Sequence, residues 1–210
     1  MNIGVLDYGA GNLKNVCRAI EHLGYKYTLV SNKEEVLSVD KLVIPGVGAF
    51  KVAMEQLKEL ELIEPLNELA VKGVPILGIC LGMQLLFQES LEFGLTKGLG
   101  LLKGNIDLIA STDLNGEQLK VPHIGWNELI INDLNKKIIQ GIKNDDPVYF
   151  VHSFRAGNLD DSQLIAYCIY GGHVLPAIVQ RNNIVGCQFH PEKSGELGLK
   201  VFDNFLRNNS

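Results

Sequence analysis

The sequence contains no long apolar run, no basic cluster and no leader-like start. Its 19 Lys and Arg residues are outnumbered by 24 Asp and Glu residues, which gives a formal net charge of -5 over 210 residues. A mildly acidic chain of this kind is not expected to bind nucleic acid or an anionic membrane. Its apolar runs are too short to cross a bilayer, and its first residues lack the basic and apolar regions of a signal peptide. We therefore expect a soluble, cytoplasmic protein.

Cysteine is scarce and widely spaced. The cysteines form no CxxC pair and show no metal-ligand spacing with histidine; they are Cys17, Cys80, Cys168 and Cys187. A zinc site or a disulfide framework is therefore not expected, and a reducing compartment suits the chain.

What is present indicates one α/β domain over residues 1–210. The chain is 46% hydrophobic, which is enough for a sizeable core at this length. Strand-like apolar runs alternate with helical patterns, which predicts a doubly wound, mostly parallel sheet flanked by helices. Around residues 98–131 short alternating stretches replace the helical pattern, so a β-rich extension is expected there. The expected strands are 2–6, 27–30, 41–44, 74–79, 107–110, 127–131, 147–154, 165–170, 177–180 and 184–189, and the expected helices are 13–23, 52–60, 62–71 and 198–206.

One stretch carries the pattern of a nucleophile. The apolar run 74–79 leads into Cys80, which stands between Gly78 and Gly82, and a helical pattern begins directly afterwards. Gly-x-nucleophile-x-Gly between a strand and a helix is a nucleophile elbow, whose turn leaves no room for side chains beside the nucleophile. A helix N-terminus also favours a thiolate. We interpret Cys80 as a nucleophile, with a small buried cysteine as the plain alternative.

A histidine and a carboxylate follow the last expected strand. His190 and Glu192 stand two residues apart, directly after 184–189. A nucleophilic thiol needs an imidazole as its base, and the imidazole needs an acceptor that sets its tautomer and supports its charge. These two residues therefore form a candidate triad with Cys80. On their own they fit a turn before the last helix, with Ser194 as its cap.

Other strand ends carry candidate ligand contacts. The loop 45–50 bears two glycines and can offer backbone N–H groups to an oxyanion, or it is a flexible turn. Gln84 lies one helical turn after Cys80 on the same face. Glu92 is either a contact for a substrate ammonium group or a surface acid, and Ser153 lies near the end of the strand expected at 147–154. His152 is interpreted as a satisfied, semi-buried histidine, and Asn12 as the cap of the first helix.

These motifs resemble those of a known family. Gly78-x-Cys80-x-Gly82-x-Gln84 together with His190-Pro191-Glu192 resembles the class I, or triad, glutamine amidotransferases, over nearly the whole chain. Within that class, segments 7–12, 45–50, 122–127, 149–153 and 190–194 are similar to the glutaminase subunits of imidazole glycerol phosphate synthases, which act in histidine biosynthesis. The resemblance implies the fold of the class and glutamine hydrolysis without a metal or organic cofactor, because both steps are acyl transfers.

The resemblance also implies a role for each candidate residue and a partner. Cys80 is the nucleophile, His190 the proton carrier and Glu192 the group that orients it. The implied oxyanion hole is made by Val47, Gly48 and Leu81, and the implied contacts of L-glutamine are Gly46, Gln84, Glu92 and Ser153. The implied partner is a (β/α)8-barrel cyclase subunit in a heterodimer, and its candidate contacts are Asn12, Asn15, Arg18, Trp126 and Lys193.

Other functions remain open from the sequence. The first alternative is a glutaminase subunit of another synthase, such as that for anthranilate or pyridoxal phosphate, although segments 7–12 and 125–127 argue against this. A stand-alone cysteine hydrolase of γ-glutamyl peptides is a second alternative. A non-catalytic α/β regulatory subunit is a third, and the intact Cys80, His190 and Glu192 argue against it.

Overall fold

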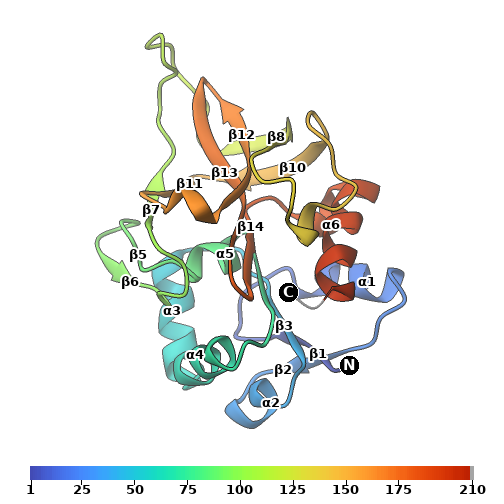
Figure 1. Ribbon diagram of the computed structural model, residues 1–210. Coiled ribbons are helices and arrows are strands. Elements are labelled where there is room, and N and C mark those ends of the chain that lie inside the picture. The colour runs from blue at the N-terminus through green and yellow to red at the C-terminus, as the bar shows by residue number, and fades with distance from the viewer. Residues whose placement is uncertain (209–210) are drawn as a thin grey trace.

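A long mixed sheet runs through the computed structural model, which describes residues 1–208 (Figure 1). Its eight strands are, in spatial order, β2 (Tyr27–Val30), β1 (Ile3–Leu6), β3 (Lys41–Ile44), β4 (Ile76–Ile79), β14 (Ile184–Cys187), β13 (His173–Arg181), β12 (Leu164–Tyr170) and β9 (Ile130–Ile131). Neighbours from β2 to β14 pair in parallel, and those from β14 to β9 pair antiparallel. The predicted α/β fold with a helix-flanked sheet is confirmed, and its parallel strands lie together at one side.

Helices cover both faces of the parallel part. Leu42 and Ile44 of β3 belong to one buried cluster, whereas Val43 between them belongs to the other, because side chains alternate along a strand. Both faces are therefore buried, which is why these strands read as continuous apolar runs. The helices are α1 (Leu13–His22), α2 (Lys33–Leu37), α3 (Phe50–Glu59), α4 (Ile63–Val71), α5 (Leu81–Leu85) and α6 (Gly195–Arg207), with 3-10 turns η1 (Lys137–Ile139), η2 (Asp161–Gln163) and η3 (Pro191–Lys193).

The expected β-rich extension is present but built differently from the prediction. One small sheet has the order β11 (Phe154–Gly157), β7 (Asn105–Leu108), β5 (Glu89–Ser90), β6 (Thr96–Lys97), and a separate pair joins β8 (His123–Glu128) to β10 (Pro147–His152). The strand expected at 107–110 begins two residues earlier in the structure, as β7, and the one expected at 127–131 is divided between β8 and β9. Helix α2 and strand β11 were not predicted, since both are short and lack a clear period.

A buried lysine fixes the C-terminal helix to the sheet. Lys41, at the start of β3, donates from Nζ to the carbonyl oxygens of Phe205 (3.0 Å) and Asn208 (2.6 Å) at the end of α6. The last carbonyls of a helix lack intrahelical partners, so a cation there satisfies them and complements the helix dipole. Because α6 begins directly after η3, this contact also anchors the segment that carries His190 and Glu192.

Candidate active site

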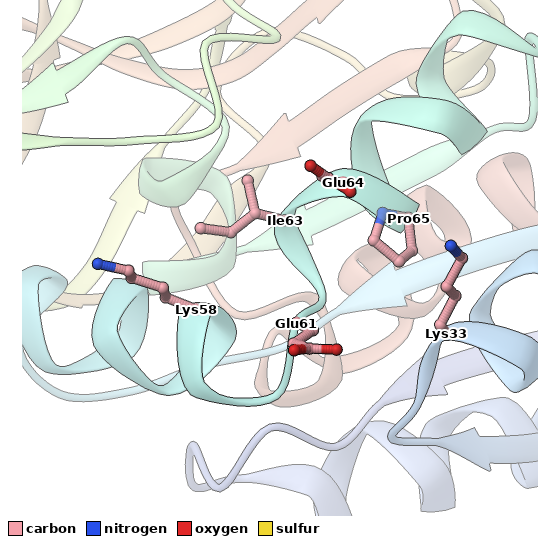
Figure 2. Close-up of a pocket in the computed structure, with 6 residues that line it drawn as sticks. All are labelled: Lys33, Lys58, Glu61, Ile63, Glu64 and Pro65. Carbon is pink, nitrogen blue, oxygen red and sulfur yellow. The ribbon is translucent and has the colours of Figure 1, made fainter.

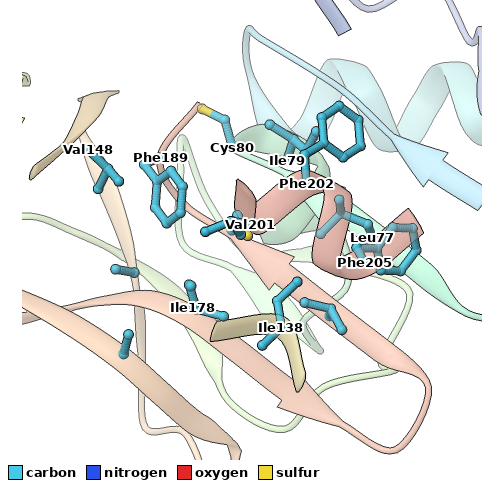
Figure 3. Packing of buried hydrophobic residues seen from close by; sticks show 14 of the residues in the cluster. Leu77, Ile79, Cys80, Ile138, Val148, Ile178, Phe189, Val201, Phe202 and Phe205 are labelled. Carbon is cyan, nitrogen blue, oxygen red and sulfur yellow. The ribbon is translucent and has the colours of Figure 1, made fainter. Parts of the chain in front are cut away.

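The turn after β4 has the geometry of a nucleophile elbow. Cys80 adopts φ 54° and ψ -109°, a strained conformation for a residue with a side chain. A Cβ atom on Gly82 would collide with the carbonyl oxygen of Ile44, and one on Gly78 would collide with the backbone of Gly82. Both glycines are therefore required by close backbone approach. Cys80 is 6% exposed and lies at the margin of a hydrophobic cluster (Figure 3), so it is less exposed than an elbow tip suggests.

His190 and Glu192 form a buried, hydrogen-bonded pair. Nδ1 of His190 lies 2.7 Å from Oε1 of Glu192, and both side chains are fully shielded from solvent. Burial lowers the pKa of His190, but the interactions of the ring with Cys80 and Glu192 outweigh it and raise the pKa to about 9. The other ring nitrogen, Nε2, is buried and has no hydrogen-bond partner among residues 1–208. The imidazole is therefore held on one side and is available on the other.

Sheet pairing brings these residues to the sulfur. Strands β4 and β14 are parallel neighbours with Ile79 opposite Cys187, and the amide of Cys80 donates to the carbonyl of Cys187 (2.8 Å). The chain then turns through His190, whose amide donates to the carbonyl of Tyr149 (3.0 Å). Ser194, which the plain alternative made the cap of the last helix, makes no cap contact with its hydroxyl and instead donates to the carbonyl of His190 (2.7 Å). The segment after β14 is thus fixed by backbone contacts on both sides.

Asn12 has a different role from the helix cap that we predicted. It occupies the N-cap position of α1 with φ 77°, but its side chain caps nothing. Its Nδ2 instead donates to Oε1 of Glu192 (2.5 Å) and lies 3.5 Å from Nδ1 of His190. Asn15 in turn donates to Oδ1 of Asn12 (2.8 Å). A residue that the sequence pattern placed at the partner surface therefore also restrains the carboxylate of the pair.

A cavity of about 320 Å³ opens beside Cys80. Its lining combines the elbow, the 45–50 loop and the turn between β10 and β11, and includes Val47, Gly48, Cys80, Leu81, Gln84, Glu92, Pro122, Val151, His152, Ser153 and Phe154. Most of the candidate oxyanion and substrate residues thus meet at one hollow. Gly46 lies outside this lining, because it is buried against the Tyr8 hydroxyl and the Leu81 side chain.

Gln84 is fixed by its amide nitrogen. Its Nε2 donates to the carbonyl of Phe154 (3.2 Å) and to Oε1 of Gln188 (3.1 Å). Both amide hydrogens are then engaged, so its oxygen is the group left to accept a hydrogen bond from a ligand. Gln188, which we did not single out, places Nε2 3.8 Å from the sulfur of Cys80. Its position two residues before His190, in a strand-like segment, is a signal that it faces the same way.

Glu92 is not the solvated surface acid that we offered as its plain reading. It is only 8% exposed, and its Oε2 accepts a hydrogen bond from the amide of Phe50 (2.7 Å), the first residue of α3. A carboxylate at a helix N-terminus satisfies a free amide and complements the dipole. Ser153 is half-buried at the rim of the cavity, between β10 and β11.

The loop after β3 is anchored at its base and open at its tip. The Tyr8 hydroxyl, which is fully buried, donates to the carbonyl of Pro45 (2.9 Å). At the other end Val47 is 40% exposed, and Gly48 has φ 122° with no atom near its Cβ position. A positive φ of this size favours glycine, so the sequence permits a peptide orientation here that other residues resist.

The candidate partner contacts surround this site on the outside. Trp126 is 58% exposed and packs edge-on against Tyr149, with ring centroids 5.9 Å apart. Asn15 and Arg18 on α1 and Lys193 in η3 are exposed as well. These side chains come from elements next to the His190–Glu192 pair: η3 contains Glu192, α1 follows Asn12, and β8 pairs with β10.

The hollow beside Cys80 is not the largest. One of about 470 Å³ lies where α2 and the α3–α4 connection meet, lined by Lys33, Lys58, Glu61, Ile63, Glu64 and Pro65 (Figure 2). It has no nucleophile, and its charged side chains extend from separate elements, so we assign no chemistry to it. Residues 1–208 contain no group of three or more His, Cys, Asp and Glu side chains arranged to hold a metal ion. No helix within this range is long and apolar enough to cross a membrane.

Comparison with known proteins agrees with this site. Residues 4–209 match the family model described as glutamine amidotransferase class-I. The imidazole glycerol phosphate synthase subunit HisH 1 of Legionella pneumophila (strain Lens) is 44% identical over 98% of this chain and 99% of its own. The corresponding HisH subunit of Lactococcus lactis subsp. lactis is 47% identical, covering 97% of each chain.

Solved structures share the fold at low identity. A crystal structure of a glutamine amidotransferase superposes with a TM-score of 0.75 at 19% identity, covering 98% of this chain and 97% of that one. PurLQS from Thermotoga maritima gives a TM-score of 0.71 at 22% identity, with 98% and 97% covered. The chain belongs to the class-I glutamine amidotransferase family and, within it, to the HisH subunits of imidazole glycerol phosphate synthase.

Proposed function

We propose that the chain, as a single domain over residues 1–210, is a glutaminase that hydrolyses L-glutamine at Cys80 and passes the ammonia to a cyclase subunit. The observation that carries this proposal is a strained cysteine at the edge of a cavity, beside an imidazole that a buried carboxylate holds through one ring nitrogen. The relatives' names point to the synthase of imidazole glycerol phosphate.

In the first half-reaction the sulfur of Cys80 attacks the side-chain carbonyl carbon of glutamine. The resulting oxyanion is stabilised by the amide of Leu81, which as the first residue of α5 has no intrahelical acceptor, and by an amide of Val47 or Gly48. His190 gives its proton to the departing nitrogen, so ammonia leaves and a γ-glutamyl thioester remains.

In the second half-reaction His190 takes a proton from water, which attacks the thioester and releases glutamate. Glu192 supports the positive charge of the imidazole in both steps. Gln84 and Glu92 offer oxygen atoms to the amide and ammonium groups of the substrate, and Ser153 lies at the rim. Each step moves only protons and an acyl group, so no redox partner is needed.

The partner that we propose is a (β/α)8-barrel cyclase, which takes the ammonia and forms imidazole glycerol phosphate and an aminoimidazole carboxamide ribonucleotide. Exposed Trp126, Asn15, Arg18 and Lys193 support docking next to the site. The Val47–Gly48 peptide then completes the oxyanion hole only in the complex, because the loop tip is free. Equal glutamine turnover by the isolated subunit and by the ligand-loaded complex would contradict this regulation.

Cys80→Ala, assayed together with the cyclase, tests the proposal. We expect glutamine-dependent synthesis to fall by at least about 10⁴-fold, while added ammonium salt still supports the cyclase. Cys17→Ala is the matched control, because Cys17 is a buried cysteine of α1 outside the cavity, and it should retain glutamine-dependent activity. If both nitrogen sources fail with the Cys80 variant although it folds and binds the cyclase, the assignment is wrong.

A further inference from the structure

A chain of hydrogen bonds runs from the surface of β8 to the wall of the cavity. Register pairing of β8 with β10 sets His123 directly opposite His152, and Nδ1 of His123 lies 3.0 Å from Nε2 of His152. Nδ1 of His152 lies 2.8 Å from the carbonyl oxygen of Phe154, and Nε2 of His123 lies 3.4 Å from Nδ2 of Asn127. Both histidines are buried. None of the proposed chemical steps uses them.

The two ends of this chain determine where its protons are. The Phe154 carbonyl can only accept, so Nδ1 of His152 carries a proton and, in the neutral ring, Nε2 accepts from Nδ1 of His123. Nδ2 of Asn127 also donates to the carbonyl of Ile169 (3.0 Å), which fixes the orientation of that amide. Asn127 therefore donates to Nε2 of His123, and every atom has a single consistent role. One extra proton would bring two donors face to face.

The chain ends on the group that fixes Gln84. The carbonyl of Phe154 accepts from both His152 and Gln84, at 2.8 Å and 3.2 Å. Gln84 donates its second hydrogen to Gln188, whose own amide nitrogen lies 3.8 Å from the Cys80 sulfur. Loss of the His152 contact removes one of the two side-chain donors to the Phe154 carbonyl, so this carbonyl holds the amide of Gln84 less firmly, although β11 stays paired and the contact with Gln188 remains. The free oxygen of Gln84 is then less well fixed in the position in which it meets a substrate.

We propose that His123 and His152, as a neutral pair, are positioning residues that hold Gln84 for glutamine binding. This inference rests on the proposed glutaminase function, because Gln84 is assigned there to the substrate. It predicts an effect on the KM for glutamine more than on the reactivity of the sulfur itself. A residue that only maintains the fold would change both together.

Two variants of His152 separate these roles. His152→Leu removes both ring contacts, whereas His152→Asn retains a donor near the position of Nδ1. With the cyclase present, we expect His152→Leu to raise the KM for glutamine roughly tenfold, the value of one lost hydrogen bond, and His152→Asn to recover most of it. Alkylation of Cys80 by iodoacetamide, which needs no glutamine contact, should stay within about twofold of the unmodified protein.

The matched control is His173→Leu. A ring nitrogen of His173 also lies within hydrogen-bond distance of a carbonyl, that of Thr112 at 2.8 Å. His173 lies outside the lining of the cavity, so the KM of this variant for glutamine should not change. Equal KM values for His152→Leu and the unmodified protein would overturn the proposal, as would equal losses for the Leu and Asn variants. Parallel loss of alkylation would do so as well. An unmodified protein that does not hydrolyse glutamine would instead refute the proposed function.

A measurement on the unmodified protein covers the case in which His152→Leu does not fold. The nitrogen-15 shifts of histidine-labelled protein at neutral pH report which ring nitrogen carries the proton. We expect His123 and His152 to be neutral with the proton on Nδ1. A proton on Nε2 of His152, or a doubly protonated ring, would overturn the proposal without any assay of activity.

Discussion

Two histidine clusters lie beside the same sulfur, and they differ in what their rings meet. In the triad cluster, His190 meets the carboxylate of Glu192 at 2.7 Å, with Asn12 on the same oxygen. In the paired-histidine cluster, His152 meets a backbone carbonyl at 2.8 Å and a second imidazole at 3.0 Å. Both rings are buried. Their surroundings therefore differ in charge rather than in access to water.

The difference shows that the partner decides the protonation state of a buried histidine. Burial lowers the pKa of both rings, because it disfavours the charged form. For His152 burial prevails, aided by repulsion from His123 and His190, and the pKa falls to about 4. For His190 the influence of Cys80 and Glu192 prevails and the pKa rises to about 9. One ring is suited to carry a proton in catalysis, and the other is suited to hold its neighbours in place.

Glu192→Gln removes the charge that distinguishes the triad cluster from the paired-histidine cluster, and we expect it to have the largest effect on activity. The amide keeps the shape of the side chain but removes its charge, so the pKa of His190 should fall, with only the interaction with Cys80 left to oppose burial. Losing the orienting carboxylate should lower kcat for glutamine on the order of 10³-fold, about 4 kcal/mol. Steady-state hydrolysis in the presence of the cyclase measures this. The exposed Glu196→Gln at the start of α6 is the control, and a loss below about tenfold for Glu192→Gln would show that the carboxylate is not needed.

The pH dependence of stability sharpens the comparison, because the two clusters act in opposite directions. His152 has a lowered pKa, so its contribution is complete above the unfolded value of about 6.5 and is lost as the pH falls towards 4. The loss should reach about 3 kcal/mol. His190 has a raised pKa, so its contribution is complete below about 6.5 and is lost as the pH rises towards 9.

Urea unfolding between about pH 4 and 9.5 measures both limbs. We expect a maximum of unfolding free energy near the unfolded pKa of histidine, about 6.5. In His152→Asn the acidic limb should be shallower and the alkaline limb unchanged, whereas Glu192→Gln should flatten the alkaline limb. A variant that changed both limbs equally would mean that the clusters are not independent.

The triad cluster could largely be predicted from the sequence, because local geometry fixes it. Gly78 and Gly82 flank a turn that admits no other residue, and His190 and Glu192 stand two apart after one strand. The contribution of Asn12 was not predictable in this way. It reaches Glu192 across 180 positions of sequence, and its residue type is equally typical of a helix cap.

The paired-histidine cluster shows why other parts of the site could not be predicted from the sequence. His152 is hydrogen-bonded as predicted but is buried rather than semi-buried, and its partner depends on the register of β8 against β10. That pair lies outside the long sheet, and no turn of fixed length sets its register. For Glu92 the sequence left a surface acid open beside a substrate contact, since only the tertiary structure places the start of α3 against its carboxylate.

Asn127→Asp gives the paired-histidine cluster a carboxylate, as the triad cluster has, and we expect it to have the smallest effect on activity. The new carboxylate would face Nε2 of His123, which accepts from the amide of Asn127 in the unmodified protein. A carboxylate accepts hydrogen bonds and does not donate them, so it stabilises a second proton on His123, at Nε2, while Nδ1 still donates to His152. Burial lowers the pKa of His123 in the unmodified protein. We expect the substitution to raise it by about one unit, or about 1.4 kcal/mol.

Titration of the ring resonances by NMR measures this shift, with Asn127→Ala as the uncharged control. The effect on the KM for glutamine should be small, about twofold, because Asn127 is the member of the chain farthest from Gln84 and each intervening contact absorbs part of the change. The carboxylate also loses the donor to Ile169, so some stability is lost in both variants alike. If the pKa of His123 rises equally in the Ala variant, loss of packing is the cause and the nature of the partner does not set the charge of this ring.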